Sequence, residues 1–181
     1  PDFISLSKGL TSGYLPLSAT GISSKIWKEV ENKIPPGLIF ANALTTSNHA
    51  TSCAVALANI EIIEKEKLVK NSEQQGKYLL NQLKAKFKKN SMVKEIRGLG
   101  LMAGINWKNN RDAPENYMGR KKILANKVFA NEFSMNFVSE CLKRGLIVRP
   151  VGPNTVVAPP LCTSKKEVDK IVSIMVIYRN F

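Results

Sequence analysis

The sequence predicts an α/β protein with two or more layers, and three features of its pattern indicate this. A short apolar run typical of a strand opens the chain at 3–6, an apolar helix is predicted over 51–64, and a mixed module of short strands and helices follows. The composition changes from apolar to lysine-rich near Lys65. We therefore expect a first domain over 1–65 and a second over 66–181.

The opening of the chain is expected to form two strands and a helix. Residues 2–7 form an apolar run that is too short for an ordinary helix and is stopped by a glycine, so they predict a buried strand. Two glycines and a proline within 9–16 predict a shaped loop, and 17–22 can return as a second strand. Helical spacing over 24–33 predicts a helix that the following Pro-Pro-Gly sequence ends.

The middle of the chain is expected to contain two long helices and a strand pair. The helix over 51–64 combines small and large apolar residues, which predicts burial on most sides. Apolar residues in a charged background over 68–89 predict an amphipathic surface helix. Residues 93–98 and 101–107 are interpreted as two strands joined at glycines.

The last third of the chain completes the small mixed module. A polar loop is expected over 109–120, and a helix over 126–144 that stops at a glycine. Short strands are expected over 146–149 and 155–158. The spacing from Ser164 to Glu167 is typical of a capping box at the start of a final helix.

Composition and charge limit the classes of function. Hydrophobic residues make up 44% of the chain, which is enough for one ordinary core or two small ones. No apolar run reaches the roughly 18 residues that span a bilayer, and no leader pattern opens the chain. We therefore expect a soluble, cytoplasmic protein that does not bind a membrane. The opening residues are typical of a strand already in progress, so the chain is interpreted as a piece of a longer protein.

The cysteines and the basic charge predict no metal site and no nucleic-acid site. Cys53, Cys141 and Cys162 form no CxxC pair, and with the single His49 they make no plausible zinc site, so reduced thiols are expected. The net charge of +13 would suit a polyanion. The lysines of 65–89, however, lie on predicted helix faces without interleaved aromatic residues, which favours a solvated surface.

The segment most informative about chemistry is Ser7–Ala19, SKGLTSGYLPLSA. Lys8 follows a predicted buried strand and precedes a glycine loop, where a partly desolvated amine can act as a nucleophile. On residue type alone, a lysine is usually an exposed surface residue. The position therefore needs further support before a role can be assigned to it.

Five ordered segments resemble the class III (ω-amino acid type) aminotransferases, which depend on pyridoxal phosphate. Ser7–Ala19 resembles the segment of the cofactor lysine, and Phe40–Glu61 resembles the family's H-G-x-T-Y-S-G-H-P segment and the alanine-rich helix after it. Val93–Ile105 resembles the V-R-G-x-G-L-M-x-G strand pair, and Gly145–Pro150 and Val157–Leu161 resemble the C-terminal strands and a P-P-L turn. The resemblance spans essentially the whole chain and corresponds to the C-terminal two-fifths of the family proteins.

The resemblance implies a fold, a cofactor and three site residues. It implies the fold type I of pyridoxal-phosphate-dependent transferases, with the end of the large cofactor domain and an interdomain helix over 1–65 and the small C-terminal α/β domain over 66–181. Lys8 would form a Schiff base with pyridoxal 5'-phosphate and then move a proton between the substrate carbon and the cofactor. Thr45 would bind the cofactor phosphate, usually that of the partner subunit, and Arg149 would bind the substrate carboxylate. Independently of the family, a salt bridge remains an alternative for Arg149, and a loop or cap position for Thr45.

The resemblance also shows departures around Thr45. Residues other than the family's His, Gly, Tyr, Gly and Pro stand at Asn42, Ala43, Thr46, Asn48 and Ala50. If position 48 requires a positive φ, asparagine is the best non-glycine residue for it. His49 matches the family histidine, but a histidine before a helix is more often a packing or capping residue, and it is assigned no catalysis.

The leading interpretation is transamination between an amino donor and a 2-oxo acid such as pyruvate. The segment TSGYLPLSA resembles members that act on ω-amino acids, taurine-like amines or diamines. Two alternatives stay open, a racemase or aminomutase of the same fold and a non-catalytic basic binding domain. The resemblance implies a homodimer with sites at the subunit interface. It also assigns other cofactor residues to an N-terminal part, so this fragment is expected to be inactive alone.

Overall fold

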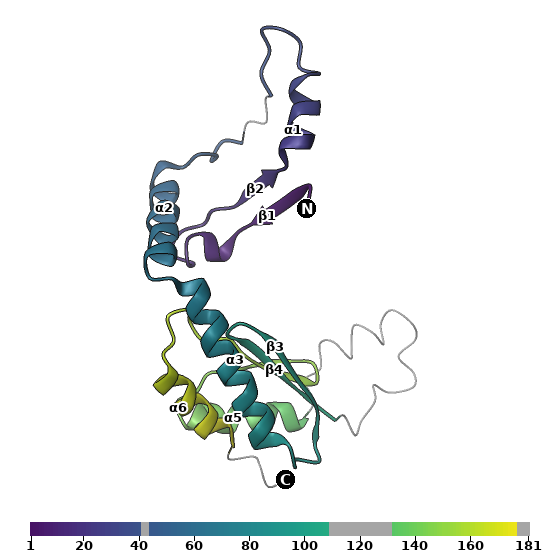
Figure 1. Cartoon of the computed structure of the whole chain (residues 1–181), viewed down its shortest axis with the longest axis vertical. Coiled ribbons are helices and arrows are strands. Elements are labelled where there is room, and N and C mark those ends of the chain that lie inside the picture. Colours follow the sequence, from purple (N-terminus) through teal and green to yellow (C-terminus); the bar gives the residue numbers. More distant parts are fainter. Residues whose placement is uncertain (41–43, 109–131, 177–181) are drawn as a thin grey trace, which may run out of the picture. The chain divides into compact units, whose positions relative to one another are not determined.

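The computed structural model describes residues 1–40, 44–108 and 132–176, and the chain divides into two compact units (Figure 1). The first unit is Pro1–Lys67 and the second is Leu68–Phe181. Among the residues described, each unit contains a sheet of its own, two-stranded in the first unit and four-stranded in the second.

The sheet of the first unit is an antiparallel pair of short strands. Strand β1 (Phe3–Leu6) pairs with β2 (Ala19–Ile22), so the two expected strands are confirmed. The expected burial of the first strand is wrong for this chain, because all four residues of β1 are exposed, and Phe3 has 57% of its surface accessible. A two-stranded sheet gives little cover by itself, and no described part of this unit forms a second layer over β1.

Two helices follow the strand pair in the first unit. Helix α1 (Ser24–Glu31) begins after Ser23, whose Oγ accepts a hydrogen bond from the amide of Ile26 at 3.4 Å. Helix α2 (Ala50–Lys65) is confirmed, but its expected burial on most sides is wrong, because only Ser52 and Ala56 are buried. Within the unit it packs against the short 3-10 helix η1 (Lys8–Leu10), which can cover only a small part of its apolar surface.

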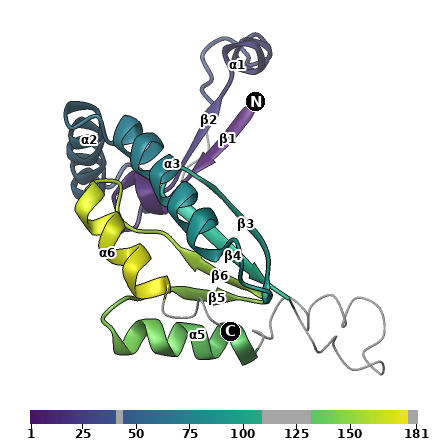
Figure 2. The same cartoon turned by 60° about the horizontal axis from the view of Figure 1, so that its bottom comes forward.

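The second unit is built on a four-stranded antiparallel sheet (Figure 2). Its strands are β3 (Val93–Leu99), β4 (Met102–Trp107), β5 (Arg149–Val151) and β6 (Asn154–Val157), in the spatial order β3-β4-β6-β5. The strands expected over 93–98, 101–107 and 155–158 are confirmed.

The strand expected over 146–149 is wrong except at its last residue. Gly145 has a φ of +79° and ends the preceding helix, and the amide of Leu146 donates a hydrogen bond back to the carbonyl oxygen of Cys141 at 2.9 Å. This is the geometry of a helix C-terminus stopped by glycine. The amide of Leu146 is therefore used at the end of the helix, and sheet pairing begins only at Arg149.

Two helices of the second unit pack against its sheet, α3 (Leu68–Phe87) and α5 (Glu132–Lys143), and a third, α6 (Lys165–Met175), packs against α3. The capping box is confirmed, because Ser164 and Glu167 exchange side-chain and backbone hydrogen bonds at the start of α6. The loop expected over 109–120 and the helix residues expected over 126–131 lie outside the described residues. Among the helices described, none combines the length and the apolar character that a membrane span requires.

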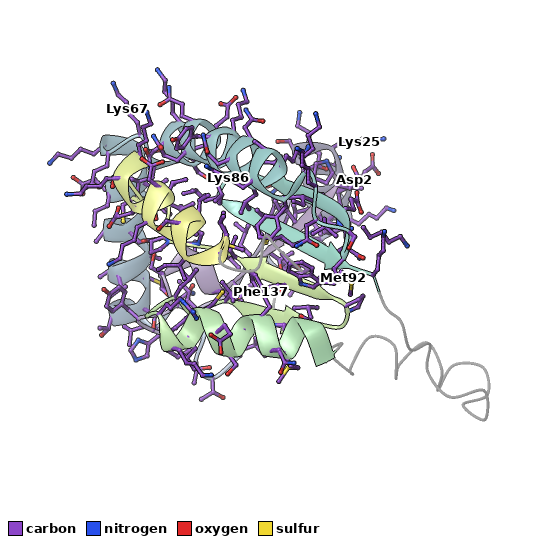
Figure 3. The ribbon with its side chains drawn as sticks, turned by 90° about the horizontal axis from the view of Figure 1, so that it is seen from below. Asp2, Lys25, Lys67, Lys86, Met92 and Phe137 are labelled. Carbon is purple, nitrogen blue, oxygen red and sulfur yellow. The ribbon has the colours of Figure 1, made fainter. Side chains whose placement is uncertain are left out.

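The core of the second unit lies between its helices and the sheet. Phe137 of α5 lies in the interior (Figure 3), and its ring centroid is 4.9 Å from that of Trp107 of β4. The indole Nε1 of Trp107 donates a hydrogen bond to the Thr155 hydroxyl at 2.9 Å, which in turn lies 3.1 Å from the Ser134 hydroxyl. In the described ranges no buried side-chain nitrogen or oxygen lacks a hydrogen-bond partner, so these polar groups are satisfied within the core.

One backbone approach fixes α3 against the β3–β4 turn. A Cβ added to Gly76 of α3 would stand 2.0 Å from the carbonyl oxygen of Gly100, which itself has a φ of +53°. The Ser72 hydroxyl accepts a hydrogen bond from the amide of Leu101 at 3.2 Å beside this point. The contact therefore requires the absence of a side chain at position 76.

Candidate functional site

The structure places Lys8 at the point where β1 turns into η1. Its backbone has a φ of +47°, the left-handed region that a residue with a side chain rarely adopts. The expected partial desolvation is wrong for this chain by itself, because Lys8 is exposed. Within the described residues its Nζ makes no hydrogen bond and no ion pair, so the amine is free to react or to bind.

Hydrogen bonds within the turn hold the backbone of Lys8. Its carbonyl oxygen accepts from the amides of Thr11 at 3.3 Å and Gly13 at 3.2 Å. The Thr11 side chain is 1% exposed, and its hydroxyl donates to the carbonyl oxygen of Leu15 at 2.6 Å. The amine of Lys8 therefore extends from a fixed turn.

Helix α2 contributes a residue to this turn that the sequence did not single out. The side-chain amide of Asn59 donates to the carbonyl oxygens of Gly9 at 2.9 Å and Leu10 at 3.2 Å. Its Oδ1 accepts a hydrogen bond from the Ser12 hydroxyl at 2.5 Å. Asparagine within a helical pattern gives no sequence signal for such a contact, because its partners lie about fifty positions earlier in the chain.

Thr45 lies in the turn that leads into α2. Its side chain is exposed, and among the described residues its hydroxyl has no hydrogen-bond partner. Asn48 has a φ of +56°, so this position does use the left-handed conformation for which asparagine is suited. Asn42 and Ala43, two of the departures from the family pattern, lie outside the described residues.

His49 is the N-cap of α2, which confirms its interpretation as a capping residue. Its Nδ1 accepts a hydrogen bond from the amide of Ser52 at 3.4 Å. The amides of Ala50 and Thr51 belong to the first helical turn and have no intrahelical acceptor. The end of α2 near Thr45 therefore presents backbone N–H groups together with the positive end of the helix dipole.

Arg149 is the first residue of β5 in the second unit, opposite Val156 of β6. Its side chain is exposed, and no carboxylate in the described part of the chain pairs with it. The salt bridge considered as an alternative is therefore not formed by any described residue. The guanidinium remains available to an anion.

Two of the expected site residues belong to the first unit and one to the second. Lys8 and Thr45 both lie in the first unit, and no hydrogen bond joins them. Arg149 lies in the second unit.

Comparison with known proteins gives a consistent result over nearly the whole chain. The family described as aminotransferase class-III matches residues 1–177. An uncharacterised aminotransferase of Sinorhizobium fredii is 38% identical over 176 residues, which is 96% of this chain and 35% of that protein. The diaminobutyrate–2-oxoglutarate transaminase of Halomonas elongata is 34% identical over 175 residues, with the same two coverages.

The fold comparison agrees with the sequence comparison. A transaminase of the marine bacterium Virgibacillus superposes with a TM-score of 0.79 at 31% identity, over 99% of this chain and 39% of that one. The described elements are thus those of a pyridoxal-phosphate-dependent transaminase of fold type I. The chain spans about a third of the length of the curated relatives that it matches. The order of its segments, its fold and the family match agree, and the chain belongs to the class III aminotransferases.

Proposed function

We propose that this chain supplies the cofactor lysine and the C-terminal portion of a pyridoxal-phosphate-dependent transaminase. The enzyme would transfer an amino group from an ω-amino acid, a taurine-like amine or a diamine to a 2-oxo acid such as pyruvate. The observation that carries the proposal is the free amine of Lys8, which extends from a turn whose backbone is fixed.

The residues present suit the chemistry of pyridoxal phosphate. An amine without an ion-pair partner can bond to an aldehyde, and Lys8 offers one. The free hydroxyl of Thr45 and the first-turn amides of α2 can accept and donate hydrogen bonds as a phosphate requires. In the family this phosphate belongs to the cofactor of the partner subunit, so the proposal includes a homodimer with sites at the subunit interface.

Lys8 would have two tasks. Its Nζ would hold the cofactor covalently by condensing with the aldehyde, with loss of the carbonyl oxygen as water. The same Nζ, when free, would take up and return the proton of the substrate carbon that carries the amino group. When bound, the cofactor supplies an electron sink that makes removal of this proton possible.

Arg149 would bind the carboxylate of the acceptor. A guanidinium can donate two parallel hydrogen bonds to a carboxylate, which fixes the orientation of a 2-oxo acid as well as its affinity. The exposed and unpaired state of Arg149 among the described residues supports this role. The proposal assigns the first unit to the end of the cofactor domain and the second unit to the small domain.

The name of one relative supports the proposed class of substrate, and the cysteines support the proposed cytoplasmic location. One relative is named as acting on diaminobutyrate with 2-oxoglutarate, which supports a donor with a terminal amine. The three cysteines are free, as expected in a reducing compartment such as the cytoplasm.

The experiment is a transamination assay of the full-length protein with a panel of amines against pyruvate and 2-oxoglutarate. We expect turnover with at least one donor that carries a terminal amine, and a loss of at least about 100-fold in kcat for Lys8→Arg, since proton transfer by a positioned base contributes about that much. Exposed Lys25 is not part of the site, so Lys25→Arg is the matched control. Full activity of Lys8→Arg, or racemisation without amino transfer, would contradict the proposal.

A further inference from the structure

We infer that Asn59 is a positioning residue for Lys8, which acts by tying the Lys8 turn to helix α2. The inference rests on the proposed role of Lys8 as the cofactor lysine. Asn59 itself need not touch the cofactor or the substrate.

Every polar atom of the Asn59 side chain is used by the turn. Both carbonyl oxygens that receive its amide hydrogens belong to η1, those of Gly9 and Leu10. Its Oδ1 accepts from the hydroxyl of Ser12, beyond η1. The reversed orientation of the side-chain amide would place Oδ1 against two carbonyl oxygens, so the hydrogen bonds fix its orientation as well as its position.

The turn that Asn59 holds is strained. Lys8 has a φ of +47°, Ser12 a φ of +50° and Gly13 a φ of +78°. A residue with a side chain costs about 1–2 kcal/mol in the left-handed region, so Lys8 and Ser12 would relax if the surroundings allowed it. Because the hydrogen bonds of Asn59 fall between these two residues, they oppose that relaxation.

Relaxation at Lys8 would move its amine. A change of φ rotates the direction of the Cα–Cβ bond, and the long side chain enlarges that rotation at Nζ. A lysine that bonds to a bound aldehyde needs its amine at one place. Asn59 therefore contributes to the reaction by keeping the backbone of Lys8 in its left-handed conformation.

The chain offers a matched control on the other unit. The side-chain amide of Asn71 also donates to two loop carbonyl oxygens, those of Leu161 at 2.7 Å and Thr163 at 3.0 Å. Asn71→Ala thus removes the same chemical group and the same number of donated hydrogen bonds, and both of the acceptors belong to the loop before α6.

The first experiment measures amide hydrogen exchange in the full-length protein without cofactor. We expect Asn59→Ala to raise the exchange of the Thr11 and Gly13 amides, which donate to the Lys8 carbonyl, by at least about tenfold, the effect of losing about 1.4 kcal/mol. Asn59→Asp should raise it further, because a carboxylate would face two carbonyl oxygens. Asn71→Ala should leave these amides unchanged. Unchanged exchange in both Asn59 variants overturns the inference.

The second experiment adds pyridoxal phosphate to the same proteins. The rate of covalent bond formation at Lys8 is followed by visible absorbance, and the product is identified by borohydride reduction and peptide mapping. We expect a rate at least about tenfold lower in Asn59→Ala than in Asn71→Ala, in proportion to the loss of exchange protection. Equal rates would overturn the inference about Asn59 and leave the proposed function of Lys8 intact. Absence of the label at Lys8 in the unsubstituted protein would overturn the proposed function, and the positioning role with it.

Discussion

The residues on which the proposed chemistry depends share one property, an unused functional group. Lys8, Thr45 and Arg149 are exposed, and within the described residues their side chains have no hydrogen-bond or ion-pair partner. Arginines 97 and 144, in contrast, pair with neighbouring glutamates. The proposed roles of Lys8, Thr45 and Arg149 therefore rest on their match to the family motifs, and in the described part of the chain their side chains are available to a ligand.

Replacement of Arg149 should affect one substrate and spare the other. In Arg149→Ala we expect the KM for the 2-oxo acid to rise about 10- to 100-fold, because hydrogen bonds to a charged group contribute about 1.5–3 kcal/mol. The KM for an amine donor without a carboxylate should stay within about twofold. Arg97→Ala, which removes another exposed arginine of the same unit, is the control. An equal rise for both substrates would contradict the role.

The left-handed backbone of Asn48 predicts the order of stability among substitutions there. Asn48→Gly should be neutral or slightly stabilising, whereas Asn48→Val should lower the free energy of unfolding by about 1–2 kcal/mol, since a β-branched residue is strained at a φ of +56°. Thr46→Val, in the same turn without positive φ, should change it little. Urea titration measures the three values, and equal values for the two valine variants would be inconsistent with the conformation.

The buried thiol of Cys141 predicts a loss of stability at alkaline pH. Desolvation raises the pKa of this thiol to about 11 from its ordinary 9.0. Below pH 9 the thiol is protonated in both states and the stability is fully present. Between pH 9 and 11 the unfolded chain ionises first, so the free energy of unfolding falls by about 2–3 kcal/mol from this group.

Comparison with a variant isolates this contribution. Cys141→Ala should be less stable at neutral pH because of the cavity, but the difference between the two proteins should shrink as the pH rises from 9 to 11. Replacement of the exposed Cys162 by alanine is the control. A difference that stays constant across this range would show that the Cys141 thiol ionises equally in the folded and unfolded states.

At the scale of the element, the contact between α3 and the β3–β4 turn determines whether replacement of Gly76 by alanine raises or lowers the free energy of unfolding. Alanine in a helix interior is favoured over glycine by about 1 kcal/mol, so propensity alone predicts that Gly76→Ala stabilises the protein. The added Cβ would meet the backbone of Gly100 at 2.0 Å, and backbone cannot move aside cheaply. We expect a net loss of about 1–3 kcal/mol in the free energy of unfolding.

Gly104→Ala is the matched control for this prediction. Its added Cβ would lie 3.9 Å from the nearest neighbouring atom, the carbonyl oxygen of Thr155, which is ordinary contact. Thermal unfolding should show a change of no more than about 0.5 kcal/mol for this variant. Stabilisation by Gly76→Ala would contradict the close approach.

Sequence predicted the described elements well where local pattern determines them. The capping box at Ser164 and the strand pair before Trp107 follow from spacing alone, and both are present. The failures have a common cause, which is that burial depends on neighbours. Phe3 and Leu57 lie on apolar elements, yet they are 57% and 69% exposed, because the described part of the first unit does not cover them.

In the candidate site, too, features set by local sequence could be predicted and features set by distant neighbours could not. Sequence motifs proposed Lys8, Thr45 and Arg149 as site residues, and the two glycines and one proline after Lys8 predicted a shaped turn. No pattern could indicate Asn59, because its contacts with η1 join segments that are distant in the chain. Residue types near Lys8 predict a turn, but only the three-dimensional structure shows that Asn59 holds it by hydrogen bonds.

At the scale of the whole molecule, the chain corresponds to about a third of the length of its curated relatives. The exposed apolar residues of β1 and α2 are where the rest of the proposed enzyme would pack. We expect the isolated chain to show no transamination, because the family resemblance assigns the other cofactor residues to an N-terminal part. Measurable turnover by this polypeptide alone, with no complementary piece present, would contradict the proposed division of the site.

The most direct test of the account is the position of the covalent bond to the cofactor. The full-length protein is incubated with pyridoxal phosphate, reduced with borohydride, digested and mapped by mass spectrometry. We predict one dominant modified peptide, which contains Lys8, and its disappearance in Lys8→Arg. Label spread over other lysines while Lys8 stays unmodified would contradict the central claim.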